Sequence, residues 1–170
     1  IAVIGENATR RMTEGGGSSG LKVKYEVSPL DGIKNRFEKS TKIEYAMGYG
    51  SGKSLYDQVA PSPYNAKQLR DEAVALAGKS DMVVFVGGLN KSTNQDCEGR
   101  DRETYSLPFE QNELLKALTQ VNKKVIVVLV SGNAVAMPWV NDVHAIVQAW
   151  YGGTEAGNAI ADILSGDVNP

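Results

Sequence analysis

The chain has 170 residues, with 18 Lys and Arg against 20 Asp and Glu, so its formal net charge is −2. That near-balance argues against a protein that binds nucleic acid mainly through phosphate charge. The longest aliphatic run, residues 125–130, is far shorter than the roughly 20 apolar residues of a membrane-spanning helix. Cys97 is the single cysteine, which excludes an internal disulfide and a thiolate metal cluster built from this chain alone.

Apolar runs typical of buried strands alternate with helical patterns along the chain. Four of these runs end near glycine or a polar turn and occupy residues 1–5, 82–87, 125–130 and 145–150. A fifth segment, residues 42–47, alternates polar with apolar residues and is expected to form a more exposed strand. Helical patterns occupy residues 29–37, 66–77, 109–121 and 155–164, the first with Ser28 as N-cap and Pro29 at its first helical position. This alternation predicts an α/β fold, a three-layer α/β/α sandwich with a mostly parallel open sheet of about five strands.

Two of the expected loops after strands are unusually long. Residues 6–22 carry the run GGGSSG, and residues 88–107 carry the run DCEGRDR. Open parallel sheets bind ligands at the carboxyl ends of their strands, and long loops in compact domains are commonly functional. We therefore expect the functional site on these two loops.

Two glycine-rich motifs suggest other chemistry and match it poorly. GYGSGKS at 48–54 is one residue short of a phosphate-binding loop, because Met47 stands where glycine is needed. GGSSG at 16–20 matches the nucleophile elbow of serine hydrolases, with Asp142 and His144 as conceivable partners, yet residues 21–27 alternate like an extended segment rather than a helix. A serine hydrolase would need Ser18 within hydrogen-bond reach of His144.

The charged run DCEGRDR, residues 96–102, is open to two interpretations. A carboxylate on such a loop can be an acid, a metal ligand or a solvated charge, and the interleaved arginines disfavour a hard-cation site. Pairing between arginine and carboxylate that stiffens the loop explains the same residues without any chemistry. Taken alone, the run favours neither a functional nor a structural role.

Four motifs in order resolve the ambiguity: IAVIGENA followed by GGGSSG, VSPLDGIKNR, VVFVGG followed by EGRDR and LPFEQNELL, and QAWYGGTEAGNAIADILSGDVNP. Together they resemble the second, α/β-sandwich domain of glycoside hydrolase family 3, to which many β-glucosidases belong. The resemblance covers essentially the whole chain. It implies that residues 1–170 form one domain of a larger glycosidase, with an N-terminal barrel before residue 1 and a final strand after residue 170.

The resemblance also implies a mechanism divided between domains. Members of the family are retaining, exo-acting glycosidases whose barrel supplies an Asp nucleophile, and the match to EGRDR implies that Glu98 is the general acid/base. A retaining enzyme needs two carboxyl groups about 5–5.5 Å apart. Glu98 is expected to have a raised pKa in the Michaelis complex, through desolvation and the charge of the nucleophile. No metal or cofactor is implied, and the chain alone is not expected to hydrolyse aryl β-glucosides.

Neighbouring residues receive supporting roles by the same resemblance. Gly17, Ser18 and Ser19 are expected at the mouth of the cleft, on the aglycone side of a β-linked oligosaccharide or glucoside. Gly99 would permit the turn, and Asp101 and Arg102 would pair to frame the loop. The family resemblance favours a periplasmic or secreted location. The alternative is a non-catalytic carbohydrate-binding or structural module in which Glu98 is inert.

Overall fold

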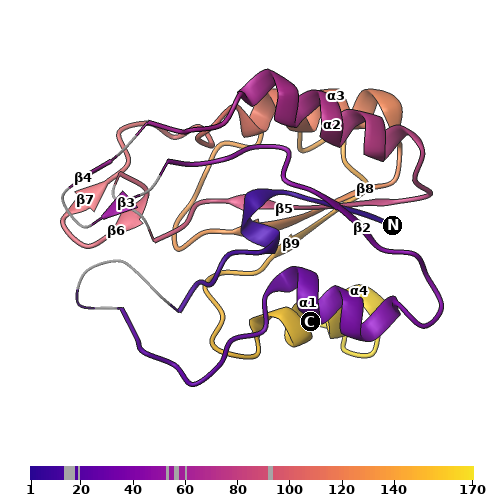
Figure 1. The fold of residues 1–170 in the computed structure, drawn as a ribbon, viewed down its shortest axis with the longest axis horizontal. Helices are drawn as coiled ribbons and strands as arrows, with labels where there is room; N and C mark the ends of the chain where they lie inside the picture. The colour runs from indigo at the N-terminus through magenta and orange to yellow at the C-terminus, as the bar shows by residue number, and fades with distance from the viewer. Residues whose placement is uncertain (14–17, 19, 53, 56–57, 60, 92–93) are drawn as a thin grey trace.

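Five parallel strands form the centre of the molecule (Figure 1). The computed structural model describes residues 1–170 except 14–17, 19, 53, 56–57, 60 and 92–93. The sheet has the order β2-β1-β5-β8-β9, with bounds β1 Ala2–Ile4, β2 Glu44–Ala46, β5 Val83–Gly88, β8 Val125–Val130 and β9 Ala145–Gln148. Each of these strands lies within or next to a run predicted as a strand.

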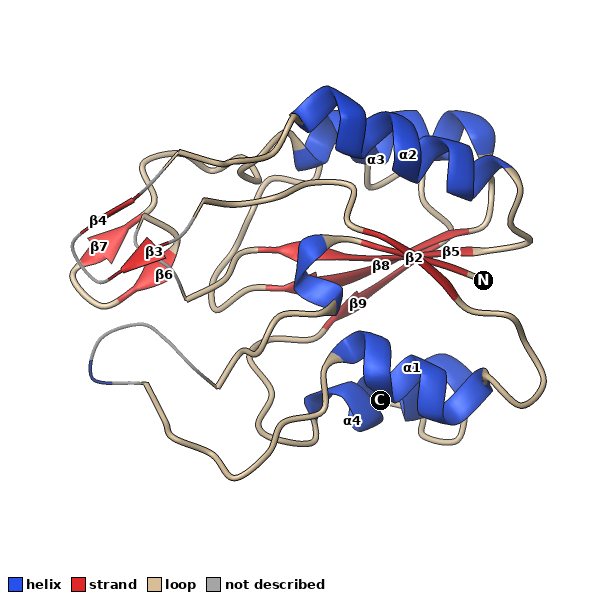
Figure 2. Cartoon of the chain, in the orientation of Figure 1, coloured by secondary structure: helices blue, strands red, loops and turns tan. Residues whose placement is uncertain are grey.

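Helices cover both faces of the sheet, giving three layers (Figure 2). Helices α1 (Pro29–Phe37) and α4 (Ala156–Ser165) cover one face, and α2 (Ala66–Gly78) and α3 (Gln111–Val121) cover the other. A short 3-10 helix, η1 (Glu6–Ala8), follows β1. The predicted α/β/α sandwich with a parallel sheet of about five strands is confirmed. Helix α3 begins two residues later than predicted because Phe109 and Glu110 are left-handed, with φ of 59° and 54°.

Two apolar clusters, one on each face of the sheet, form the core. Alternation along β5 divides its side chains between them: Phe85 packs with the residues of α2 and α3, and Val84 and Val86 pack with those of α1 and α4. The six residues of β5 are all buried. The central strands are thus fixed from both sides and provide a rigid base for the loops at their carboxyl ends.

Helices α1 and α4 touch through their backbones. A Cβ atom on Gly32 of α1 would lie 2.0 Å from the carbonyl oxygen of Gly157, and one on Gly157 would lie 2.1 Å from that of Ser28. The main-chain N–H of Gly157 also donates to the carbonyl of Val27 at 3.1 Å. Glycine is therefore required on both sides of this contact.

A buried glutamine supports the start of the loop at 88–107. Gln111, at the first position of α3, is 0% exposed. Its Oε1 accepts from the main-chain N–H of Gly88 and its Nε2 donates to the carbonyl of Gly88, both at 2.8 Å. Gly88 ends β5 with φ of 114°, so this side chain satisfies the backbone where the strand stops.

Two short antiparallel hairpins lie beyond the carboxyl ends of the parallel strands (Figure 1). They pair β3 (Ser54–Leu55) with β4 (Gln58–Val59) and β6 (Asp96–Cys97) with β7 (Arg100–Asp101). The GYGSGKS run leads into β3 rather than into a helix, and a phosphate-binding loop requires a helix at that point. Within the described part of the chain, no helix has the length and apolar character needed to cross a membrane.

Candidate active site

The turn that carries Glu98 connects β6 to β7. Cys97 pairs with Arg100 and Asp96 with Asp101, so Glu98 and Gly99 are the two residues between the paired positions. Gly99 has φ of 68°, a conformation that glycine adopts readily. The Glu98 side chain therefore stands at the tip of a hairpin, where it is exposed. This geometry leaves its carboxyl group accessible to a molecule outside the sandwich.

The carboxylate of Glu98 contacts the loop that follows β1. Its Oε2 accepts a hydrogen bond from the main-chain N–H of Ser18 at 2.8 Å. This contact brings together the two long loops in which the sequence predicts the site. Gly17 and Ser19 lie outside the described residues, so their predicted roles stay predictions.

Ser18 also changes the pKa of Glu98. Hydrogen bonds from the main chain of Ser18, and secondly from its side chain, lower the pKa of Glu98 below its ordinary value. This shift is opposite to the one expected for Glu98 in a Michaelis complex. Desolvation of the Glu98 carboxyl group acts in the opposite direction and is the smallest of the three causes of the pKa shift.

Replacing Ser18 with alanine is expected to raise the pKa of Glu98, because the variant loses the hydroxyl and keeps the main-chain donor. The pKa should stay below the ordinary glutamate value, since the main-chain bond is the larger cause. An NMR titration of the Glu98 carboxyl carbon measures it, with Ser40→Ala as a control at an exposed serine after α1. An unchanged or lowered pKa in Ser18→Ala would contradict the prediction.

Arg102 connects the hairpin to the loop after β8. Its Nε donates to the carbonyl of Thr104 at 2.9 Å, and Nη2 donates to the carbonyl of Ala134. The guanidinium also lies 5.6 Å from the centre of the Tyr105 ring. Arg102 is thus held by two backbone carbonyls. The side chain of Asp101 lies outside what the structure describes, so the predicted Asp101–Arg102 pair stays a prediction.

Besides the contacts of Glu98 with Ser18 and of Arg102 with two carbonyls, Asp96 also anchors the hairpin, and the sequence did not predict this. The carboxylate of Asp96 accepts hydrogen bonds from Gly132 N at 2.7 Å, Asn133 Nδ2 at 2.5 Å and Tyr151 Oη at 2.7 Å. Burial, followed by the contact with Asp96, raises the pKa of Tyr151, so its hydroxyl remains a donor. These partners follow β8 and β9 and are distant in sequence, and no local pattern around Asp96 indicates them.

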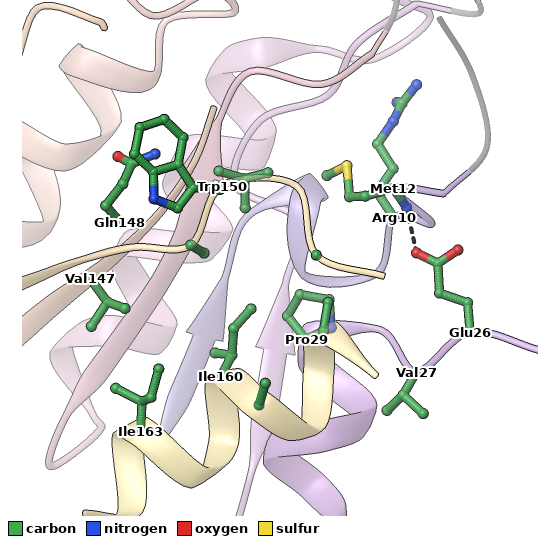
Figure 3. Close-up of a pocket in the computed structure, with 15 residues that line it drawn as sticks. Arg10, Met12, Glu26, Val27, Pro29, Val147, Gln148, Trp150, Ile160 and Ile163 are labelled. Carbon is green, nitrogen blue, oxygen red and sulfur yellow. Dashed lines mark hydrogen bonds between the residues drawn. The ribbon is translucent and has the colours of Figure 1, made fainter. Parts of the chain in front are cut away.

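An apolar pocket lies between α4 and the end of β9 (Figure 3). Ile160 and Ile163 of α4, Val147 of β9 and Pro29 of α1 form much of its wall. At its rim, Glu26 accepts a hydrogen bond from Met12 N at 2.6 Å. None of the residues that line this pocket belongs to the predicted site. Trp150 also lines it and is 59% exposed.

The serine-hydrolase alternative fails on geometry. Ser18 contacts Glu98, beyond the carboxyl ends of the strands. The main-chain N–H of His144 donates to the carbonyl of Val125, at the amino end of β8, which places His144 at the opposite end of the sheet. Ser18 and His144 therefore cannot act as nucleophile and base in one site.

Comparison with known proteins decides the family. The model of the glycosyl hydrolase family 3 C-terminal domain matches residues 1–170. The chain belongs to this family. The match confirms the resemblance indicated by the four motifs. We refer to residues 1–170 as the family 3 domain, and this domain is one part of the longer relatives described next.

Two relatives match the family 3 domain over its whole length. The beta-glucosidase BoGH3A of Bacteroides ovatus is 53% identical, and the chain covers 23% of it. A beta-xylosidase of Formosa agariphila is 38% identical, and the chain covers 22% of it. The family 3 domain thus spans less than a quarter of the length of these two relatives.

Solved structures share the fold. The GH3 beta-glucosidase of Bifidobacterium adolescentis matches the whole family 3 domain with a TM-score of 0.78 and 34% identity, and the match covers 23% of that chain. DesR, a beta-glucosidase of Streptomyces venezuelae, matches it with a TM-score of 0.86 and 23% identity over 33% of that chain. The second likeness is one of fold alone.

Proposed function

We propose that this domain supplies Glu98 as the general acid/base of a retaining, exo-acting β-glycosidase that hydrolyses β-linked oligosaccharides or glucosides. The observation that carries the proposal is the exposed carboxyl group of Glu98 at the tip of the β6–β7 hairpin, beyond the carboxyl ends of the strands. In the full-length enzyme, an N-terminal barrel supplies the Asp nucleophile and most sugar contacts. The chain by itself lacks that nucleophile and does not turn over substrate.

The chemistry uses Glu98 twice. In the first step, protonated Glu98 gives its proton to the leaving glycosidic oxygen while the barrel's Asp attacks the anomeric carbon. In the second step, ionised Glu98 takes a proton from the water that hydrolyses the covalent intermediate. A side chain on an exposed tip can meet a nucleophile that belongs to another domain, as this division of labour requires.

The contact with Ser18 favours one of these two forms. It stabilises ionised Glu98, which is the base of the second step. Protonation for the first step then depends on the barrel, because a nearby carboxylate and the exclusion of water both raise the pKa of a carboxyl group. Ser18 lies beside the acid, which supports a place for it on the aglycone side of the cleft.

The test is Glu98→Ala in the full-length enzyme, assayed on aryl β-glucosides with different leaving groups. General acid catalysis contributes about 10²- to 10⁴-fold, so we expect a loss of that order in kcat/KM on phenyl β-glucoside and a much smaller loss on dinitrophenyl β-glucoside. A good leaving group departs without a proton. An equal loss on both substrates would remove the acid role from Glu98, and unchanged activity on both would favour the non-catalytic module.

A further inference from the structure

The hairpin that carries Glu98 is too small to hold its own position. It has two paired residues in each strand, and isolated two-stranded hairpins are marginally stable even when longer. A general acid must be held close to its productive geometry, because a misplacement of about 1 Å can cost on the order of 100-fold in rate. The position of Glu98 therefore depends on whatever holds the base of the hairpin.

Asp96, the first residue of β6, connects that base to the segments beyond the sheet through three hydrogen bonds. Its Oδ2 accepts from Gly132 N and from the Tyr151 hydroxyl, and its Oδ1 accepts from Asn133 Nδ2. Hydrogen bonds to an ionised acceptor are about twice as strong as neutral ones. One carboxylate thus joins the hairpin to the segments that follow two neighbouring strands, β8 and β9.

The surroundings of this carboxylate fit the contact closely. A Cβ atom on Gly132 would lie 3.2 Å from Asp96 Oδ2 and 3.0 Å from Tyr151 Cε2, so glycine leaves room for both. The ammonium group of Lys91 lies 5.6 Å from the centre of the Tyr151 ring. The Tyr151 hydroxyl reaches Asp96 Oδ2 from beside this ring and donates to it at 2.7 Å.

We propose that Asp96 is a positioning residue for Glu98. It fixes the base of the hairpin against the ends of β8 and β9, so that the tip presents the Glu98 carboxyl group at one place relative to the barrel. The inference rests on the proposed function of Glu98. Asp96 itself does not touch the substrate in this role, and it acts through Cys97, the one residue of chain that separates it from the acid.

The test compares Asp96→Ala with Glu98→Ala and with the double variant in the full-length enzyme. For Asp96→Ala we expect a loss of about 10- to 100-fold in kcat/KM on phenyl β-glucoside and of less than about threefold on dinitrophenyl β-glucoside. In the Glu98→Ala background, Asp96→Ala should cost at most about twofold more, because both changes disable one group.

Milder variants keep the proposal testable if Asp96→Ala does not fold. Tyr151→Phe and Asn133→Ala each remove one donor and keep the carboxylate, and we expect smaller losses with the same dependence on leaving group. Asp96→Asn keeps an acceptor oxygen and should recover part of the activity. Glu103→Gln, at an exposed carboxylate further along the same loop, is the matched control and should leave both substrates unaffected.

The outcomes separate the two proposals. An equal loss on both substrates in Asp96→Ala, Tyr151→Phe and Asn133→Ala, beside a steep dependence in Glu98→Ala, overturns the role of Asp96 alone. Fully additive losses in the double variant overturn it as well. A flat response of Glu98→Ala itself overturns the proposed function, and the positioning role with it.

Discussion

Gly157→Ala is expected to lower the free energy of unfolding of the domain by about 3 kcal/mol or more. The added methyl group would lie 2.1 Å from the carbonyl oxygen of Ser28 and 2.7 Å from that of Val27. Both obstructions are backbone atoms, so no side-chain rotation relieves them. Helices α1 and α4 would have to separate, and the core between them and the sheet would open.

Urea denaturation followed by circular dichroism measures this effect. Gly78→Ala is the matched control, because Gly78 is also helical and a Cβ there would meet only the Cβ of Val121, at an ordinary 3.9 Å. Alanine favours helix over glycine by about 1 kcal/mol in an open position, so the control should be neutral or slightly stabilising. Equal stability of the two variants would contradict the close approach of α1 and α4.

Gln111→Ala is the second substitution with a large expected effect. It removes the acceptor for Gly88 N and the donor to Gly88 O, which leaves two buried backbone groups unsatisfied. Each such group costs about 1–3 kcal/mol, so we expect a loss of about 2–6 kcal/mol in the free energy of unfolding. Because the loop at 88–107 starts at Gly88, activity of the full-length enzyme should fall as well.

Two variants make the Gln111 experiment specific. Gln111→Glu keeps an acceptor for Gly88 N but places a buried acid where the donor was, so it should also destabilise the fold. Gln120→Ala changes an exposed glutamine of the same helix and should be neutral, since alanine is the better helix former. Wild-type stability in Gln111→Ala would show that the backbone of Gly88 finds other partners.

Much of the fold is predictable because its signals are local. Helix α1 begins and ends where Ser28, Pro29 and the pattern of apolar residues place it, and the Ser28 hydroxyl accepts from Asp31 N as an N-cap does. The central strands β5 and β8 are continuous apolar runs, as expected for a sheet covered on both faces. The start of α3 was less predictable, because two non-glycine residues there adopt left-handed backbone conformations.

The candidate site is predictable only in part. The EGRDR motif indicates Glu98, and the alternation of strands and helices puts its loop at the carboxyl edge of the sheet. The contacts around it join residues far apart in the chain: Ser18 reaches Glu98, and Tyr151 reaches Asp96. Such pairs depend on how the strands are ordered across the sheet, and no spacing in the sequence carries that information.

The hairpin at 96–101 stands outside both apolar clusters of the sandwich. A substitution on this hairpin can therefore alter the surroundings of Glu98 while the layers beneath it stay intact. Variants of this loop can consequently be compared at equal stability of the domain, which separates effects on the reaction from effects on folding.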